Sequence, residues 1–342
     1  MTFADAPKGR NNNLSALRFV AALLVIFTHA FPLTGGGKDF LLRQNGQLMS
    51  FGEIGLFGLF FYAGFLVMKS IERKNDARVY FKARCIRIFP ALWITVLLCI
   101  LVMGPLMTTL SLKDYFLNPG TWKYLINGLL VPVHDLPGVF ESNAFLPTVN
   151  GSLWTLPVEF GCYVLCWLFW RLGFSDRKKS LFSLLPVAVV GTAVFILTDG
   201  IQLVQSIVLP VSFFYLGMMA WIWRDRIPKK GWLLALCAAG AVVSMVWYGF
   251  PLLTVLTLPY VYLYLAFGTK PVFSRFGTKW ELSYGIYLSA WPLQQVLNAC
   301  FPAMGWAGNF ALSSVLSIIA AFGITFLEKK ATGLLEKTGG RG

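Results

Sequence analysis

Apolar runs close to the length of a membrane-spanning helix recur along the whole of this 342-residue chain. A helix that crosses the hydrocarbon core of a bilayer needs about 20 predominantly apolar residues. The runs lie at 14–33, 51–68, 88–109, 153–170, 181–198, 203–223, 232–249, 251–268, 281–301 and 308–327. Only 13% of the residues are charged, against roughly 25% in soluble domains. The pattern predicts an all-α polytopic integral membrane bundle of about ten transmembrane helices.

Lysine and arginine are concentrated in one of the two sets of loops between these runs. If the N-terminus lies in the cytoplasm, the inner loops and both termini hold 24 of the 29 Lys and Arg residues. Cytoplasmic loops carry such an excess in membrane proteins. We therefore expect an N-in, C-in topology, which explains the net charge of +14 without a nucleic-acid partner.

The runs leave little room for a separate soluble domain. We expect a single membrane domain over 1–342, in which 104–152 forms a long loop at the outer face. The N-terminus lacks the short apolar core and small-residue cleavage site of a signal peptide, so the first run should stay in the mature protein. The six cysteines form no CxxC pair, and we expect neither a disulfide framework nor a metal site.

The first apolar run contains two ionisable residues, Arg18 and His29. Their spacing of eleven residues comes within about 20° of three full helical turns, which places both on one helix face about 16 Å apart. Ionisable groups inside a bilayer are costly and usually functional. We expect this face to carry a cation and a potential base, although a histidine that only packs within the bundle would give the same pattern.

Two further arginines, Arg84 and Arg87, lie three residues apart at the predicted cytoplasmic end of the third run. Residues with this spacing are neighbours on a helix surface. Because a planar guanidinium binds phosphate with two parallel hydrogen bonds, the pair suits a phosphorylated cytosolic ligand. Anionic lipid headgroups are the alternative ligand.

The fourth run begins at the predicted outer face with NGSLWTLPVEFGCY over 150–163. Glu159 lies about two turns inside, where a carboxylate must be neutral, paired or exposed to a polar cavity. Pro157 can bend this helix. Trp154 suits either an interfacial aromatic anchor or a sugar-binding platform.

The loop that precedes this run, 131–152, is polar enough to bind a hydrophilic ligand. Asn150 and Ser152 end it, and both are candidates for contacts with such a ligand. His134 and Asp135 are adjacent in the loop, but adjacent side chains need not face each other, so we expect His134 to be a surface residue.

Six of these segments together resemble the acyltransferase family 3 of membrane acyltransferases, which modify bacterial surface and exported glycans. The segments are Arg18 with His29, FFYAGFLVMKS at 60–70, RCIR with PALW at 84–93, GSLWTLPVEF at 151–160, SYGIYLSAWPLQQ at 283–295 and FLEKK at 326–330. Each is short, but their joint order and spacing are specific.

The chain departs from the family pattern at two places. The family commonly has an acidic residue shortly before the first-run arginine and a serine before the glycine of the second motif. This chain has NNNLSALR at 11–18, and Ala63 precedes Gly64. We therefore expect no role for a carboxylate shortly before Arg18 in the sequence, whereas the role expected of His29 is unaffected.

The resemblance implies transfer of an acyl group, most often acetyl, from cytoplasmic acyl-coenzyme A to a sugar hydroxyl across a bacterial inner membrane. His29, Arg18 and Glu159 would form the catalytic set, Arg84 and Arg87 would bind the donor, and Trp154, Asn150 and Ser152 would contact the acceptor. His29 could act as general base or carry the acyl group itself. The donor, the glycan acceptor and membrane lipids are then the expected partners, and no metal is needed.

A proton-coupled transporter of a small solute or lipid-linked sugar is the alternative function. Ten spans with intramembrane Arg18, His29 and Glu159 would suit it. However, no internal repeat is evident. A scaffold or lipid-binding membrane subunit is a third possibility, but it would leave the register of Arg18 and His29 unexplained.

Overall fold

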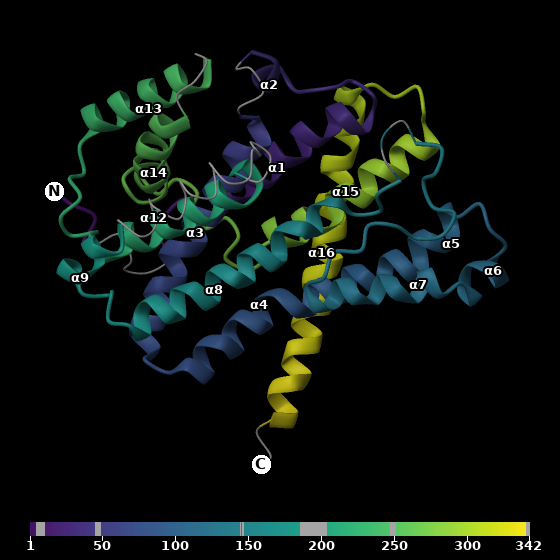
Figure 1. Cartoon of the computed structure of the whole chain (residues 1–342), viewed down its shortest axis with the longest axis horizontal. Helices are drawn as coiled ribbons and strands as arrows, with labels where there is room; N and C mark the ends of the chain where they lie inside the picture. The colour runs from purple at the N-terminus through teal and green to yellow at the C-terminus, as the bar shows by residue number, and fades with distance from the viewer. Residues whose placement is uncertain are drawn as a thin grey trace. The chain divides into compact units, whose positions relative to one another are not determined.

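The computed structural model describes residues 1–4, 11–44, 49–143, 145, 147–184, 204–246 and 251–339, and the elements in these ranges are helices (Figure 1). The longer ones are α1 (Leu14–Leu33), α3 (Phe51–Lys74), α4 (Ala77–Leu98), α8 (Thr155–Arg171), α12 (Leu209–Ile222), α13 (Gly231–Val246), α14 (Pro251–Phe267), α15 (Ser283–Cys300) and α16 (Trp306–Gly339). The shorter ones are α2 (Phe40–Gln44), α5 (Gly104–Met107), α6 (Leu112–Leu117), α7 (Pro119–Lys123), α9 (Arg177–Phe182) and the short π or 3-10 segments η1 (Cys99–Met103), η2 (Tyr124–Leu129), η3 (Gly151–Trp154) and η4 (Val204–Val208).

In the described part of the chain, five helical segments are long and apolar enough to cross a membrane: Leu14–Leu33, Phe51–Lys74, Ala77–Met107, Gly151–Arg171 and Trp306–Gly333. Shorter apolar helices cover Ser206–Ile222, Gly231–Val246 and Leu253–Phe267. The chain is therefore a multi-pass helical membrane protein. Most of the expected run at 181–198 lies outside the described residues.

The run predicted at 281–301 forms a helix, α15, but this helix is not among the candidate spans. Its sequence includes the amide side chains of Gln294, Gln295 and Asn298, which are all buried. These polar side chains reduce the mean hydropathy of α15, and their burial indicates that they bond to other parts of the protein.

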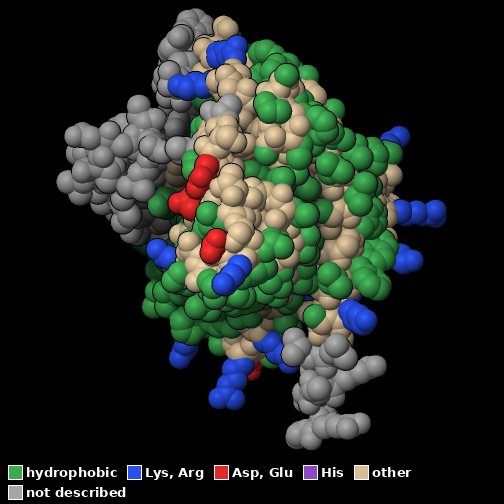
Figure 2. All heavy atoms as spheres, turned by 90° about the vertical axis from the view of Figure 1, so that its right-hand side faces the viewer, with side chains coloured by type: hydrophobic (Ala, Val, Ile, Leu, Met, Phe, Trp, Pro, Cys, Tyr) green, Lys and Arg blue, Asp and Glu red, His purple; other side chains and the backbone are tan. Residues whose placement is uncertain are grey.

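The side chains of α16 show the reverse of the arrangement found in a soluble protein. Its exposed face carries large apolar side chains at Leu312, Val315, Ile319, Phe322 and Phe326. Its buried face carries the polar side chains of Asn309, Ser313, Ser317 and Thr325. A helix with an apolar face toward its surroundings suits lipid, and Figure 2 shows a face of the molecule covered chiefly by hydrophobic side chains.

The chain divides into two compact units. The first unit comprises Met1–Ala21, Phe40–Phe81 and Val158–Thr278, and the second comprises Ala22–Asp39, Lys82–Pro157 and Lys279–Gly342. Helix α1 passes from the first unit into the second after Ala21, and α8 passes from the second into the first after Pro157.

In the first unit, α3 and α12 approach each other closely at two glycines. A Cβ atom at Gly64 would lie 1.9 Å from the carbonyl oxygen of Phe214, and one at Gly217 would lie 2.1 Å from that of Phe61. Small residues allow this close backbone approach, which is typical of helix pairs in membranes. Gly64 of the FFYAGF motif is therefore required for helix packing.

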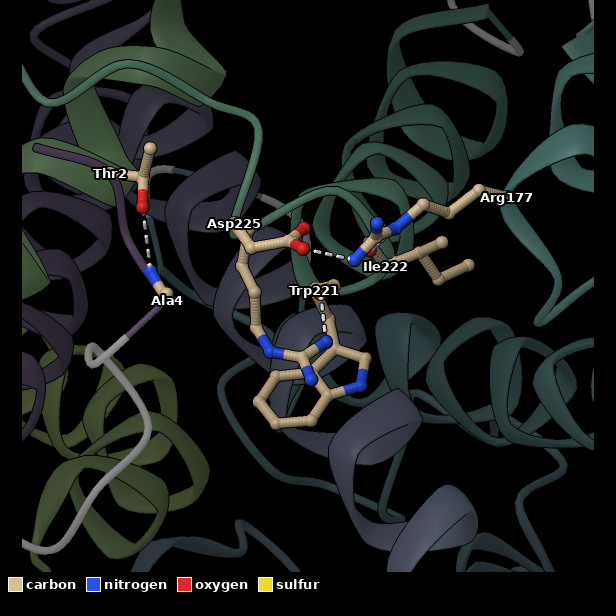
Figure 3. A network of polar contacts seen from close by, with 7 residues as sticks. Thr2, Ala4, Arg177, Trp221, Ile222 and Asp225 are labelled. Carbon is tan, nitrogen blue, oxygen red and sulfur yellow. Dashed lines mark hydrogen bonds and ion pairs between the residues drawn. The ribbon is translucent and has the colours of Figure 1, made fainter.

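The basic loops of the first unit are joined by polar contacts, shown in Figure 3. Arg177 forms an ion pair with Asp225 and donates from Nε to the carbonyl of Ile222 (3.3 Å). The guanidinium of Arg224 lies 3.8 Å from the ring centroid of Trp221 and donates to the Trp221 carbonyl (2.6 Å). These contacts fix the loops that follow α8 and α12.

In the second unit, the long segment predicted as a loop at 104–152 contains α5, α6, α7 and η2. The α6 residue Tyr115 donates its hydroxyl to the carbonyl of Ile100 in the wide turn η1 (3.0 Å). Its side chain also fills the space that a Cβ at Gly104 would occupy. The segment therefore packs back against the end of α4.

Candidate functional site

The C-terminal half of α1 presents His29 to α15 within the second unit. The rings of His29 and Trp291 meet edge to face, with centroids 4.7 Å apart and planes at 72°. The indole Nε1 of Trp291 donates to the carbonyl of Thr148 (2.9 Å). One edge of Trp291 is thus fixed to the segment before η3, while its ring packs against His29.

The His29 side chain is half-buried, and its Nδ1 atom is buried without a hydrogen-bond partner in the described structure. Buried polar atoms in native structures nearly always have a partner. A neutral imidazole has one donor and one acceptor nitrogen. One ring nitrogen of His29 therefore has no hydrogen-bond partner among the described residues, and it is closed to solvent in this structure.

The residues predicted to contact the acceptor lie at η3. The side chain of Asn150 accepts from the Ser152 backbone N–H (3.1 Å) and donates to the carbonyl of Leu288 on α15 (2.8 Å). Asn150 is fully buried, so its amide orders η3. The Ser152 hydroxyl is buried without a hydrogen-bond partner among the described residues, and Trp154 is half-buried.

The same turn contacts the indole that packs against His29. A Cβ at Gly151 would lie 2.7 Å from Cζ2 of Trp291. The Tyr287 hydroxyl donates to the carbonyl of Ser152 (3.1 Å) and lies 2.6 Å from Oγ1 of Thr155. Helix α15 therefore brings η3 and His29 against one side chain, Trp291.

The sequence alone indicates no role for Trp291 or Tyr287. Both lie within the segment SYGIYLSAWPLQQ, which carried the family resemblance. What could have indicated a role is that a predicted span carries, four residues apart, two large aromatic side chains that can each donate a hydrogen bond. Their partners, at Thr148 and Ser152, lie more than 130 residues away.

Arg87 of α4 lies against the N-terminal end of α15. The Arg87 guanidinium lies 4.9 Å from the ring centroid of Tyr284, and the Tyr284 hydroxyl donates to the carbonyl of Ile88 (3.1 Å). Both Arg84 and Arg87 are half-buried. Seven residues separate Tyr284 from Trp291, which corresponds to one face of α15 and about 10 Å along its axis. The residues of α15 that contact Arg87 and His29 therefore lie on the same face of this helix.

Arg18 and Glu159 belong to the first unit. Arg18 lies on α1, and the continuous helix from Leu14 to Leu33 confirms that it shares a helix with His29. Glu159 accepts a hydrogen bond from the hydroxyl of Tyr163, one turn further along α8. Both side chains are half-buried. The other six predicted site residues all belong to the second unit.

His134 and Asp135 are exposed. The six cysteines are free thiols. No group of three or more His, Cys, Asp or Glu side chains that could hold a metal ion occurs among the residues described.

Residues 11–327 match the family described as the acyltransferase domain, acyltransferase 3. The chain is 26% identical to an O-acetyl transferase of Shigella phage Sf6 over 347 aligned residues, which cover 96% of each chain. It is 29% identical to nodulation protein 10 of Rhizobium leguminosarum bv. viciae over 239 residues, 65% of this chain and 62% of that protein. No solved structure matches the chain significantly. With the family match spanning nearly the whole chain, the protein is a member of the acyltransferase 3 family.

Proposed function

We propose that this protein transfers an acyl group, most simply acetyl, from acyl-coenzyme A to a hydroxyl of an exported or cell-surface glycan. The unpartnered Nδ1 atom of His29, buried beside Trp291, is the observation that carries the proposal. Family membership supports the acyl transfer, and the name of the phage relative supports acetyl as the acyl group.

His29 is the residue proposed to handle the proton of the acceptor. In a direct transfer, the imidazole takes the hydroxyl proton while the sugar oxygen attacks the thioester carbonyl. The carbon–sulfur bond then breaks, and the coenzyme A thiolate leaves with a proton returned by the imidazolium. In the two-step route, His29 itself attacks the thioester and the acceptor hydroxyl then displaces the acyl group from the ring.

Arg84 and Arg87 are proposed to bind the phosphates of the donor. The position of Arg87 over the ring of Tyr284 supports this role, because the aromatic contact holds the guanidinium plane in one orientation. Bidentate hydrogen bonding to phosphate requires such an orientation. The basic loops support an N-in, C-in topology, which would place this pair on the cytoplasmic side, where acyl-coenzyme A is found.

The acceptor is proposed to bind near η3. The Ser152 hydroxyl is buried without a hydrogen-bond partner among the described residues, Trp154 offers a half-buried aromatic surface, and Asn150 holds the turn in place. Arg18 is proposed to orient the donor or, alternatively, to pair with Glu159, which belongs to the same unit. In this proposal the protein lies in a bacterial inner membrane and uses no metal.

Incorporation of radiolabelled acetyl into glycan tests this function. Cells that make the protein, cells that lack it and cells that make His29→Ala are grown with labelled acetate, and the surface polysaccharide is then isolated and counted. We expect label only with the wild-type protein. Equal labelling in all three strains would contradict the proposal, and uptake of a solute without acylation would instead favour a transporter.

A further inference from the structure

Three buried amide side chains link α15 and α16 to α1 on both sides of His29. Gln294 donates from Nε2 to the carbonyl of Ile26 (3.0 Å) and to Oδ1 of Asn309 (3.0 Å). Asn309 donates from Nδ2 to Oδ1 of Asn298 (2.9 Å), and Asn298 donates from its own Nδ2 to the carbonyl of Leu33 (2.7 Å). The three amides form one continuous chain of hydrogen bonds between two carbonyls of α1.

The two carbonyls belong to the α1 face that carries His29. Ile26 lies three residues before His29 and Leu33 lies four residues after it, so all three share one helix face. Leu33 is the last residue of α1, and its carbonyl has no partner within the helix. A carbonyl inside the helix can accept a second hydrogen bond, as that of Ile26 does. The amide chain, which we call the amide clamp, therefore holds α1 on the side of Trp291.

A proline weakens the hydrogen bonding of this part of α1. Pro32 lies within the helix, lacks a backbone N–H and therefore gives no hydrogen bond to the carbonyl one turn earlier. A helix weakened in this way can bend or rotate near the proline. All three amides are at most 7% exposed, and solvent does not compete with them for the α1 carbonyls.

We propose that Gln294, Asn298 and Asn309 are positioning residues for His29, which fix the rotation and axial position of α1 so that the imidazole meets Trp291 and the reacting groups. The proposal rests on the catalytic role proposed for His29. It predicts that loss of the clamp lowers the rate of the chemical step while leaving donor binding unchanged, because Arg84 and Arg87 lie outside the clamp.

The test uses the full-length protein reconstituted in vesicles. Gln294→Met removes both donors of Gln294 at similar volume, and Asn298→Asp is a nearly isosteric change that removes the donor to Leu33. Ser317→Ala is the matched control, because Ser317 is also buried on α16 but lies outside the clamp. Thermal unfolding of each variant shows that it is folded.

Two readouts are compared. The chain has only two histidines, so selective isotope labelling of histidine gives two ring signals by nuclear magnetic resonance, and His134→Gln assigns them. In both clamp variants we expect the His29 signal to shift or broaden and kcat to fall about 10- to 100-fold, as expected for misplaced reacting groups. The KM for acyl-coenzyme A should stay at the wild-type value, and Ser317→Ala should change neither readout.

An unchanged His29 signal in both clamp variants, or a loss of kcat no larger than in Ser317→Ala, would overturn the proposal. The proposed function fails separately, if His29→Ala retains activity. In that case the His29 signal in the clamp variants still tests whether the amides position this side chain.

Discussion

Replacing Gly151 by alanine is expected to slow acyl transfer by displacing the indole of Trp291. The new Cβ would lie 2.7 Å from Cζ2 and 2.8 Å from Cε2 and Cη2 of that ring. Since carbon atoms in contact lie about 3.5 to 4.0 Å apart, the ring or the turn η3 must move by roughly 1 Å. The bond from Trp291 Nε1 to Thr148, now 2.9 Å, would then exceed the usual hydrogen-bond range.

The expected loss follows from this displacement. Misplacing a reacting group by about 1 Å costs on the order of 100-fold in rate, which corresponds to about 2.7 kcal/mol of transition-state stabilisation. The ring of His29 packs directly on Trp291, so the displacement reaches the imidazole. The loss should appear in kcat more than in the KM for acyl-coenzyme A, because Arg84 and Arg87 are not disturbed.

The assay measures initial rates of acetyl transfer by purified protein in vesicles at several donor concentrations. Gly323→Ala is the matched control: it lies in α16 of the same unit, and its Cβ would meet nothing within 4 Å. We expect the control to behave like the wild-type protein or to be slightly more stable. Equal rates for Gly151→Ala and Gly323→Ala would refute the packing of η3 on Trp291 as a determinant of activity.

Three further substitutions separate the proposed roles. Trp291→Phe keeps an aromatic ring beside His29 but loses the hydrogen bond to Thr148, worth about 1 kcal/mol, and kcat should fall roughly fivefold; a wild-type rate would show that this bond is dispensable. Arg87→Lys keeps the charge but loses the planar contact with Tyr284 and the bidentate contact with phosphate, so the KM for acyl-coenzyme A should rise while cysteine-labelling topology stays the same. His134→Ala should leave the rate unchanged, because His134 is exposed. Complete loss of transfer would instead identify His134, in the predicted outer segment, as the proton acceptor.

The helices that the sequence predicted best are those defined by local apolar length. The run at 14–33 forms a helix with these bounds, and Arg18 and His29 share it as their spacing required. The clustering of arginines at Arg84 and Arg87 was likewise visible, because α4 is continuous there. In both cases the prediction depends only on the spacing of residues within one helix.

The contacts that order the candidate site were not visible in the sequence. By its apolar length the run at 281–301 predicts an ordinary span, whereas Trp291 and Gln294 bond to residues far away in the chain. The packing of α1, α15 and α16 determines which carbonyl accepts a hydrogen bond from each buried amide. The periodicity of apolar residues in the sequence does not specify that packing. The short helices of 104–152 were missed for a similar reason, because Tyr115 is ordered by its contact with the end of α4.

The role of His29 is tested most directly by the rate of acetyl transfer that purified His29→Ala catalyses in vesicles at saturating acyl-coenzyme A. Removing a general base typically costs about 10²- to 10⁴-fold, and the loss would be complete if His29 carries the acyl group. We predict a rate at least about 100-fold below that of the wild-type protein, with normal insertion and thermal stability. A folded His29→Ala protein that transfers acetyl at close to the wild-type rate would show that the imidazole beside Trp291 does not perform the chemistry.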